Sequence, residues 1–354
     1  MRREMMRATR EQAIALLKSA AYVHLASTTP EGEPVLRAVH GVILGEALYF
    51  HGAPVGEKTS LVGRATVLSV EELIAEIPSY WTDPVMACPA TSLYVSVQVH
   101  GTLDAVRDSR EKAAALQALM ERFQPEGGHE PIRYDDERYR KQVDGVALCK
   151  LSLEKLDAKW KLGQNRTPDY VRTVVEQLWK RGAAGDDRAI ELLLEANARV
   201  DRPAFLLGPH GTTLSVWSDD RALSEALPLL RDEYWNRDRF DDASIVRAHR
   251  ASSAWVVARD PHGAMIATAR AVSDGEKYCY LGDVAVRSDW RGRAVGAAVV
   301  HLLLDHPAVR RARRVELATR DAMRFYQRLG FVTVAQHDNG SFIRSTMELV
   351  RTHA

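Results

Sequence analysis

The sequence has few cysteines, almost no net charge and no long apolar run. Its three cysteines, Cys88, Cys149 and Cys279, form no Cys-x-x-Cys pair, which argues against a disulfide framework and a cysteine zinc site. The formal net charge of +1 gives no reason to expect nucleic acid or a membrane surface as partner. No stretch approaches the roughly 20 apolar residues that span a bilayer, and the N-terminus lacks a signal peptide's apolar core. These absences predict a cytoplasmic protein.

The length of the chain predicts two domains. Its 354 residues are more than a typical single domain contains, and 46% hydrophobic with 27% charged residues is a globular composition. Helices are predicted over 10–20 and 109–123, between short strands that are separated by turn residues. Strict alternation over 93–100 is typical of a strand in the wall of an antiparallel barrel. The strands of this part are predicted at 21–27, 34–44, 47–51, 64–71, 92–105 and 146–153.

The pattern changes after a helical stretch over 168–198, which is broken at 182–185. The Gly- and Pro-rich residues 202–211 form the best candidate linker, so the domain boundary is predicted between residues 205 and 206. Strands and helices alternate beyond it, which indicates an α/β domain. There, strands are predicted at 212–217, 253–259, 263–272, 278–286, 313–319 and 331–336, and helices at 220–230, 294–305 and 321–329.

The most informative segment is 280–300. An apolar strand runs into a turn rich in arginine and glycine, and the turn opens directly into a helix. Free backbone N–H groups and the positive end of a helix dipole then meet at one point, which suits a pyrophosphate. Arg291 and Arg293 add charge, and Gly292 and Gly296 allow a close backbone approach. Taken alone, the segment is also compatible with a junction that binds nothing.

The following stretch, 314–331, is predicted to be a strand and a short helix. Asp321 is the expected N-cap and Gly330 the expected C-cap. Phe325 and Leu329 lie four residues apart and form a core-facing stripe, with Tyr326 beside it and able to face a cleft.

Together these elements resemble the GNAT superfamily of N-acetyltransferases over residues 212–354. The motif Arg/Gln-x-x-Gly-x-Gly/Ala falls on 291–296, with Ala294 where the family usually has glycine, and the signature Phe325-Tyr326-x-x-Leu-Gly-Phe is intact. The resemblance implies that Tyr326 protonates the departing thiolate of acetyl-CoA. It also implies two groups of binding residues: Val284, Ala285 and Val286 for the pantetheine arm, and Arg291, Gly292, Arg293, Ala294, Val295 and Gly296 for the pyrophosphate.

Direct attack by an amine needs a neutral amine, a polarised carbonyl and an acid for the sulfur. Asp283 is a candidate to take the amine's proton through water, and a carboxylate tied to backbone or to an arginine is an equal alternative. Tyr234 and Trp235 either wall the acceptor pocket or pack a core. For the arginines of 310–314, a solvated basic face is preferred over a contact with the 3′-phosphate of CoA.

The N-terminal part carries a weaker signal. In residues 49–60 a His-Gly turn lies at the end of a strand, and a lysine follows in the first turn of a short helix. This arrangement is either a phosphate clamp or only a structural turn. Residues 8–200 nevertheless resemble the FMN-binding split-barrel flavoproteins, closest to the pyridoxamine-phosphate-oxidase-like and nitroimidazole-reductase-like branch. The matching features are 37–41, 50–53 with Lys58, 94–97 and 159–166.

This second resemblance implies FMN at the interface of a homodimer formed through the barrel, with basic and hydroxyl side chains on its phosphate. Carried over, it nominates His51, Lys58 and Ser60, with Lys161, Gln164 and Arg166 from the same or the partner subunit. The proline-bearing loop 78–91 departs from the family, and its Tyr80 and Trp81 either stack on the flavin or pack the loop.

Some members of this family bind haem and others have lost their cofactor. No metal site is predicted here, and the barrel's histidines are only remote iron candidates: His24, His40, His51 and His100. The predicted fold class is two-domain α+β, an antiparallel split β-barrel followed by a GNAT-type mixed α/β sheet.

The favoured function is a bifunctional protein, an FMN-binding oxidoreductase barrel with an acetyl-CoA-dependent N-acetyltransferase acting on a small amine. The alternatives are an acetyltransferase whose barrel only senses a cofactor or dimerises, and a flavin- or haem-binding regulator.

Overall fold

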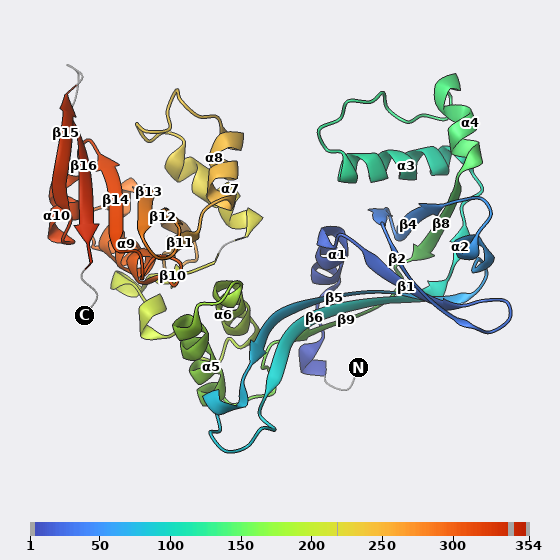
Figure 1. Ribbon diagram of the computed structural model, residues 1–354, viewed down its shortest axis with the longest axis horizontal. Coiled ribbons are helices and arrows are strands. Elements are labelled where there is room, and N and C mark those ends of the chain that lie inside the picture. The colour runs from blue at the N-terminus through green and yellow to red at the C-terminus, as the bar shows by residue number, and fades with distance from the viewer. Residues whose placement is uncertain (1–3, 218, 339–342, 352–354) are drawn as a thin grey trace. The chain divides into compact units, whose positions relative to one another are not determined.

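The computed structural model describes residues 4–217, 219–338 and 343–351 (Figure 1). By its contacts the chain divides into two compact units. The first comprises the described residues up to Leu73 and Ser92–Gln164, and the second comprises Ile74–Thr91 and the described residues from Asn165 onward. Helical residues after 165 therefore share contacts with the second unit, while the domain boundary at 205 and 206 stays a prediction.

The larger sheet of the first unit is five-stranded, in the order β2-β1-β5-β6-β9. β1 pairs with β2 and β5, and β6 with β9, in antiparallel register. The predicted alternation of β6 is confirmed, because Leu93, Val95, Val97 and Val99 are buried and the residues between them are not. The strands are β1 (Val23–Thr28), β2 (Pro34–Val39), β5 (Ala65–Ile77), β6 (Thr91–Thr102) and β9 (Lys155–Lys161).

The smaller sheet of this unit is four-stranded and antiparallel, in the order β3-β4-β8-β7. Its strands are β3 (Val42–Leu44), β4 (Ala47–Gly52), β7 (Asp104–Ala105) and β8 (Ala147–Ser152). Two sheets of short antiparallel strands match the barrel architecture expected from the sequence.

Four helices accompany these sheets: α1 (Arg10–Ser19), α2 (Glu57–Ser60), α3 (Ser109–Phe123) and α4 (Glu137–Gly145). α1 begins with a capping box between Thr9 and Gln12. The predictions of α1 and α3 are confirmed, whereas α4 and β9 were missed.

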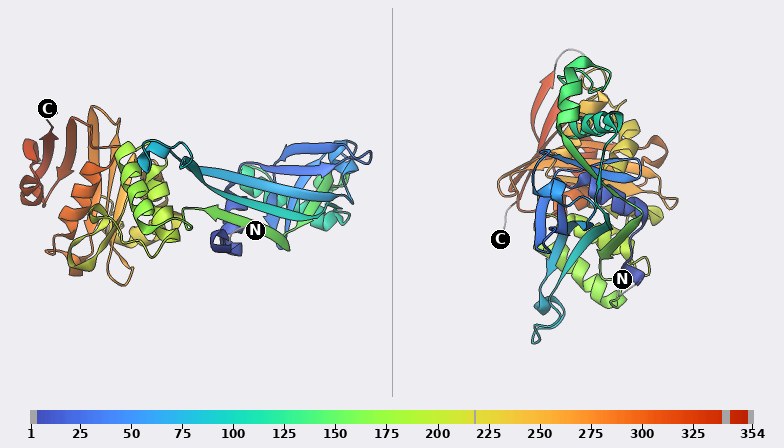
Figure 2. Two further views of the ribbon diagram at one scale, coloured as in Figure 1. Left: turned by 90° about the horizontal axis from the view of Figure 1, so that it is seen from below. Right: turned by 90° about the vertical axis from the view of Figure 1, so that its right-hand side faces the viewer.

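Two helices open the continuous part of the second unit. α5 (Pro168–Arg181) and α6 (Asp186–Ala196) lie side by side (Figure 2), and Gly182 ends α5 with a φ of +61°. Arg310 donates to the carbonyls of Trp179 and Lys180, and the Trp179 indole donates to Asp305 at 3.0 Å. These contacts cap the end of α5 and attach it to the α/β part of its unit.

The sheet of the second unit is seven-stranded, in the order β10-β11-β12-β13-β14-β16-β15. Every pairing in it is antiparallel except that of β13 with β14. The strands are β10 (Thr213–Ser215), β11 (Ala254–Arg259), β12 (Met265–Ser273), β13 (Tyr278–Val286), β14 (Arg314–Thr319), β15 (Val332–Asp338) and β16 (Ile343–Val350).

Helices cover both faces of this sheet. Trp255 and Val257 of β11 pack in one cluster with α7, while Val256 and Ala258, which point the other way, are also fully buried. α9 contacts β11, β12 and β13. The helices are α7 (Asp220–Leu230), α8 (Asp242–Arg250), α9 (Val295–Asp305) and α10 (Met323–Arg328). No helix in the described ranges has the length and apolar character needed to cross a bilayer.

The burial of His306 predicts an acid-sensitive second unit. Its ring meets Trp179 edge-on and accepts the Ala308 N–H through Nδ1, and burial lowers its pKa to about 4. Since the pKa in the unfolded chain is near 6.5, the unfolded state binds more protons between these values. Stability linked to His306 is therefore intact above about pH 6.5 and is lost as the pH falls toward 4, by up to about 3 kcal/mol.

Urea unfolding between pH 4.5 and 7.5, followed by tryptophan fluorescence, measures this loss. His306→Gln should show a shallower decline than the wild-type protein. Equal pH slopes for the two proteins would remove His306 as the source, and would point to groups such as His249, whose pKa burial also lowers.

Candidate functional site

The central feature of the second unit is the divergence of its two parallel strands. β13 pairs with β14 only from Tyr278 to Tyr280, opposite Arg314 to Glu316. Both strands continue, β13 to Val286 and β14 to Thr319. On its other edge β13 stays paired with β12 as far as Val286. The last part of β13 therefore presents backbone groups toward β14 without a strand partner.

β13 also carries a bulge in this region. Thr268 lies opposite Ala285 and Arg270 opposite Gly282, so two residues of β13 face one residue of β12. Asp283 lies in the bulge with a φ of +51°, a left-handed conformation that is uncommon for a residue with a side chain.

The turn after β13 leads into the N-terminus of α9. Gly292 and Ala294 have φ values of +76° and +61°, and Ala294 is the N-cap without a side-chain hydrogen bond to the helix. An alanine in this conformation costs roughly 1–2 kcal/mol, which glycine would avoid. The first-turn amides of α9 have no intrahelical acceptor, so the turn offers several N–H donors and the helix dipole to an anion.

The two arginines of this turn are already held. Arg291 donates from Nε to the Val286 carbonyl and from Nη2 to Glu233, each at 3.0 Å. The Arg293 guanidinium lies 5.1 Å from the Trp290 ring centroid. Burial raises the pKa of Glu233, and Arg291 opposes that rise.

Tyr326 is the buried residue of α10, with 7% of its surface exposed. Burial raises the pKa of its phenol, and Tyr234, Tyr280 and Asp321 act in the same direction. The phenol is therefore protonated at neutral pH. Within the described part of the chain its hydroxyl has no hydrogen-bond partner.

Two details of α10 differ from the sequence prediction. The N-cap is Ala322 and not Asp321. The Thr319 hydroxyl accepts the Ala322 N–H. Phe325 and Leu329 are half-buried, and Tyr326 is the residue that packs inside. Gly330 follows the helix with a φ of +90°, as its expected role in ending the helix requires.

Asp283 has both carboxylate oxygens engaged. The Trp235 indole donates to Oδ1 at 2.8 Å, and Arg270 Nε donates to Oδ2. The Asp283 side chain is 9% exposed. These contacts correspond to the second interpretation of Asp283, a carboxylate tied to an arginine. Arg270 was missed, although a charged residue inside an apolar strand is a signal for a buried ion pair.

Three consecutive residues connect the parts of this site. Glu233 holds Arg291 and Trp235 holds Asp283. Between them, the Tyr234 hydroxyl accepts the N–H of Arg320 at 2.9 Å, just beyond the end of β14. Residues 233–235 thus contact the turn, the bulge and the end of β14, and Glu233 was not nominated from the sequence.

Three of the arginines of 310–314 are engaged within the protein. Arg310 binds carbonyls at the end of α5, Arg311 pairs with Glu276, and Arg314 pairs with Glu348. Arg311 and Arg314 are exposed, as the preferred interpretation of a solvated basic face expects, whereas Arg310 is half-buried.

In the first unit, His51 and Lys58 form a basic group beside Gly52. His51 lies on β4 and Lys58 on α2, and a Cβ at Gly52 would lie 3.5 Å from Lys58 Cδ. The pKa of His51 is lowered by burial and then by the charges of Lys58 and His40. The Ser60 hydroxyl donates to the Glu57 carbonyl. Lys58 supplies a positive charge and His51 a ring N–H that suit a phosphate, whereas the Ser60 proton is already used within α2.

The second nominated group comes from the end of β9 and the residues that follow it. Lys161 ends β9 in the five-stranded sheet, 5.5 Å from the Tyr94 ring centroid, whereas His51 belongs to the four-stranded sheet. Gln164 accepts from Leu162 N–H and donates to the Trp160 carbonyl, so it shapes the turn after β9. The Arg166 guanidinium lies 4.8 Å from the Tyr170 ring centroid.

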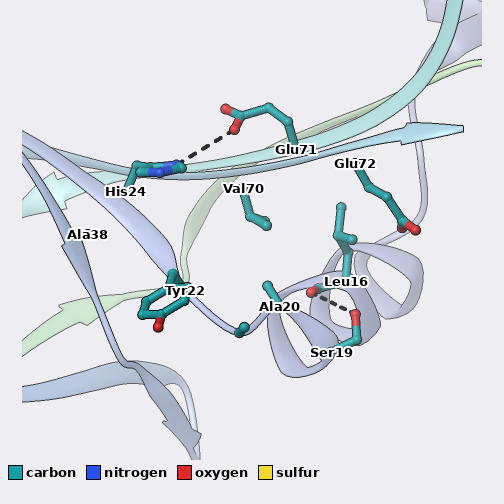
Figure 3. Close-up of a pocket in the computed structure, with 10 residues that line it drawn as sticks. Leu16, Ser19, Ala20, Tyr22, His24, Ala38, Val70, Glu71 and Glu72 are labelled. Carbon is teal, nitrogen blue, oxygen red and sulfur yellow. Dashed lines mark hydrogen bonds and ion pairs between the residues drawn. The ribbon is translucent and has the colours of Figure 1, made fainter.

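A cavity of about 510 Å³ in the first unit is lined by none of these residues (Figure 3). It lies between the end of α1 and strands β1, β2 and β5, with Leu16 and Val70 on its apolar side. His24 Nδ1 is 3.8 Å from Glu71 Oε2 at its edge. Among the described residues no three His, Cys, Asp or Glu side chains are grouped to hold a metal ion.

Comparison with known families matches each part of the chain separately. Residues 9–160 match the family described as pyridoxamine 5'-phosphate oxidase, and residues 218–331 match the acetyltransferase (GNAT) family. No curated protein matches the chain.

Two similar solved structures each match less than half of this chain. One is a GNAT-family acetyltransferase of Xanthomonas campestris pv. campestris, 32% identical over 35% of this chain and 87% of that one, with a TM-score of 0.31. Another is the flavocytochrome Anf3 of Azotobacter vinelandii, 20% identical over 45% of this chain and 70% of that one, with a TM-score of 0.38. The chain therefore joins a part that is similar to pyridoxamine 5'-phosphate oxidase, over residues 9–160, to a part that is similar to GNAT acetyltransferases, over residues 218–331.

Proposed function

We propose that the second unit transfers an acetyl group from acetyl-CoA to the amine of a small molecule. The observation that carries this proposal is the divergence of β13 from β14 beside the turn that opens α9. The unpaired backbone of Val284–Val286 suits the amide groups of a pantetheine arm, and the turn from Arg291 to Gly296 suits a pyrophosphate.

The reaction needs few groups from the protein. The neutral amine attacks the thioester carbonyl, the new C–N bond forms, and the C–S bond breaks to release the CoA thiolate. Tyr326 donates its phenolic proton to that sulfur, and the amine's proton leaves through water. Asp283 remains a candidate acceptor for the amine's proton. Its two engaged oxygens favour a structural task.

Calorimetry with acetyl-CoA and with CoA tests the binding step directly. We expect a single site per chain and a rise in melting temperature with added ligand. Release of free thiol is then followed with aromatic, aliphatic and polyamine acceptors. If acetyl-CoA gives neither heat nor a melting shift, the transferase proposal fails.

For the first unit we propose an FMN-binding oxidoreductase barrel in a homodimer. His51, Lys58 and Ser60 would hold the phosphate, and Lys161, Gln164 and Arg166 would approach from the same or the partner subunit. FMN, when bound, supplies a two-electron redox centre. The support is the basic group at His51 and Lys58, together with the family match of this part of the chain.

The absorbance of the protein as purified separates this proposal from its alternatives. Flavin bands that bleach with NADPH would support the oxidoreductase, and Lys58→Ala should weaken flavin retention. The distant surface variant Lys18→Ala serves as control. A haem spectrum, or no chromophore after reconstitution with FMN, would instead favour a regulator or a dimerisation module. Should both activities exist, reduction of a nitro group would supply an amine for acetylation.

A further inference from the structure

We propose that Arg270 and Trp235 are positioning residues that hold the β13 bulge at Asp283 in the shape that acetyl-CoA binding requires. The inference rests on the proposed acetyltransferase function, and it assigns tasks to two residues outside the family motifs.

The first step concerns the backbone of the bulge. Asp283 has a φ of +51°, a conformation that is uncommon outside glycine and that Asp and Asn adopt more readily than other side chains. The contacts around such a residue help to keep it in this conformation. At Asp283, β13 is no longer paired with β14. The contacts that hold the bulge must therefore come from β12 and from residues that pack on the face of the sheet.

The second step identifies those contacts. Arg270 stands on β12 opposite Gly282, directly across from the bulge, and its guanidinium binds Asp283 Oδ2. Trp235 arrives from the segment between α7 and α8 and donates to Oδ1 at 2.8 Å. The Arg270 and Asp283 side chains are 20% and 9% exposed, so water cannot easily replace either partner. The carboxylate is therefore held from two directions.

The third step connects this clamp to the ligand. The bulge consists of Asp283 and Val284, and the proposed pantetheine-binding backbone begins at Val284. A change at Asp283 rotates the next peptide group and misaligns its N–H and C=O. The neighbouring strand β12 is itself fixed at this level, because the buried Trp255 indole donates to the Thr268 hydroxyl and Thr268 lies opposite Ala285.

Four proteins test the proposal: wild type, Arg270→Met, the double variant Arg270→Met/Asp283→Asn, and Arg181→Met. In Arg270→Met a buried carboxylate loses its charged partner, and we expect CoA affinity to fall at least about tenfold. Asparagine tolerates positive φ and can still accept from Trp235. The double variant should therefore regain most of the affinity.

Arg181→Met is the matched control. Arg181 pairs with Asp186 at 2.5 Å, with side chains 29% and 4% exposed, so its loss also breaks a partly buried ion pair of the second unit. It should lower the melting temperature and leave CoA affinity unchanged. If Arg270→Met does not fold, Trp235→Phe is the test, because it removes the indole donor, keeps an aromatic ring in the cluster with α7, and should weaken CoA binding about threefold or more.

The outcomes separate the two proposals. Folded Arg270→Met that binds CoA like the wild type overturns the positioning role, as does a double variant with no recovery. If Arg181→Met loses as much CoA affinity as Arg270→Met, the loss reflects general destabilisation of the second unit, and the positioning role is also overturned. If Arg270→Met does not fold, Trp235→Phe with wild-type affinity overturns it. A wild-type protein that binds no CoA overturns the acetyltransferase function itself, and the positioning role falls with it.

Discussion

Tyr326→Phe is expected to lower acetyl-CoA turnover by roughly ten- to a thousand-fold, the range for loss of a general acid. The affinity for acetyl-CoA should stay within about twofold, because the ring that packs the site is retained. The substitution removes one oxygen and leaves the contacts of the aromatic ring with Phe325 and Phe331 in place. A fall in turnover without a fall in affinity is the signature of a group that acts in the transition state.

The burial of Tyr326 adds a pH prediction to the same experiment. Burial raises the pKa of this phenol above its ordinary value near 10, so the proton to be donated is present throughout the neutral and mildly alkaline range. Turnover should therefore show no alkaline decline from Tyr326 below about pH 10. Tyr278→Phe, at an exposed position on β13, is the control and should behave like the wild type. Unchanged turnover in Tyr326→Phe would remove this residue from the mechanism.

The sequence predicted the elements that have strong local signals. α3 begins and ends at the predicted residues because Asp108 caps it and apolar residues repeat at helical spacing. The turn at 291–296 and the Gly330 stop were also readable, since both depend on backbone conformations that favour glycine. Local chemistry was sufficient in these places.

The missed elements lack that local signal. α4 is rich in charged residues and has Val143 as its one buried side chain, so it shows no apolar stripe. α8 buries only Ile245 and His249. The Asp321 cap was predicted wrongly, because the helix begins one residue later, with Ala322 as its N-cap, and the Thr319 hydroxyl at the end of β14 accepts the Ala322 N–H.

The engaged partners at the candidate site were beyond sequence reasoning for a different reason. Arg270 and Asp283 are 13 residues apart and meet only through the register of β12 with β13. Glu233 reaches Arg291 across 58 residues. Motifs identified the groups proposed to face the ligand, whereas the residues that hold those groups are set by the tertiary fold.

Gly296→Trp is expected to reduce acetyl-CoA affinity by roughly a hundredfold or more, because it separates α9 from the strand it packs on. A Cβ at Gly296 would lie 3.4 Å from Val286 Cγ2 and 3.6 Å from Phe325 Cζ. One methyl group therefore fits at ordinary contact distance, but the atoms of a large side chain would overlap β13 and α10. The first turn of α9, with its unpaired amides, would move away from the end of β13.

This geometry gives Gly296 a packing role in addition to leaving space for a phosphate. Substitutions with side chains of different size distinguish the two roles. Gly296→Ala should keep acetyl-CoA affinity within a few-fold, since its methyl group only meets Val286 and Phe325. If a phosphate occupied the space beside Gly296 itself, alanine would already abolish binding. His301→Trp places the same indole on the exposed face of α9 and should bind like the wild type. Calorimetry on folded samples, checked by melting temperature, distinguishes a displaced helix from an unfolded protein, and wild-type affinity in Gly296→Trp would show that acetyl-CoA does not depend on the α9 terminus.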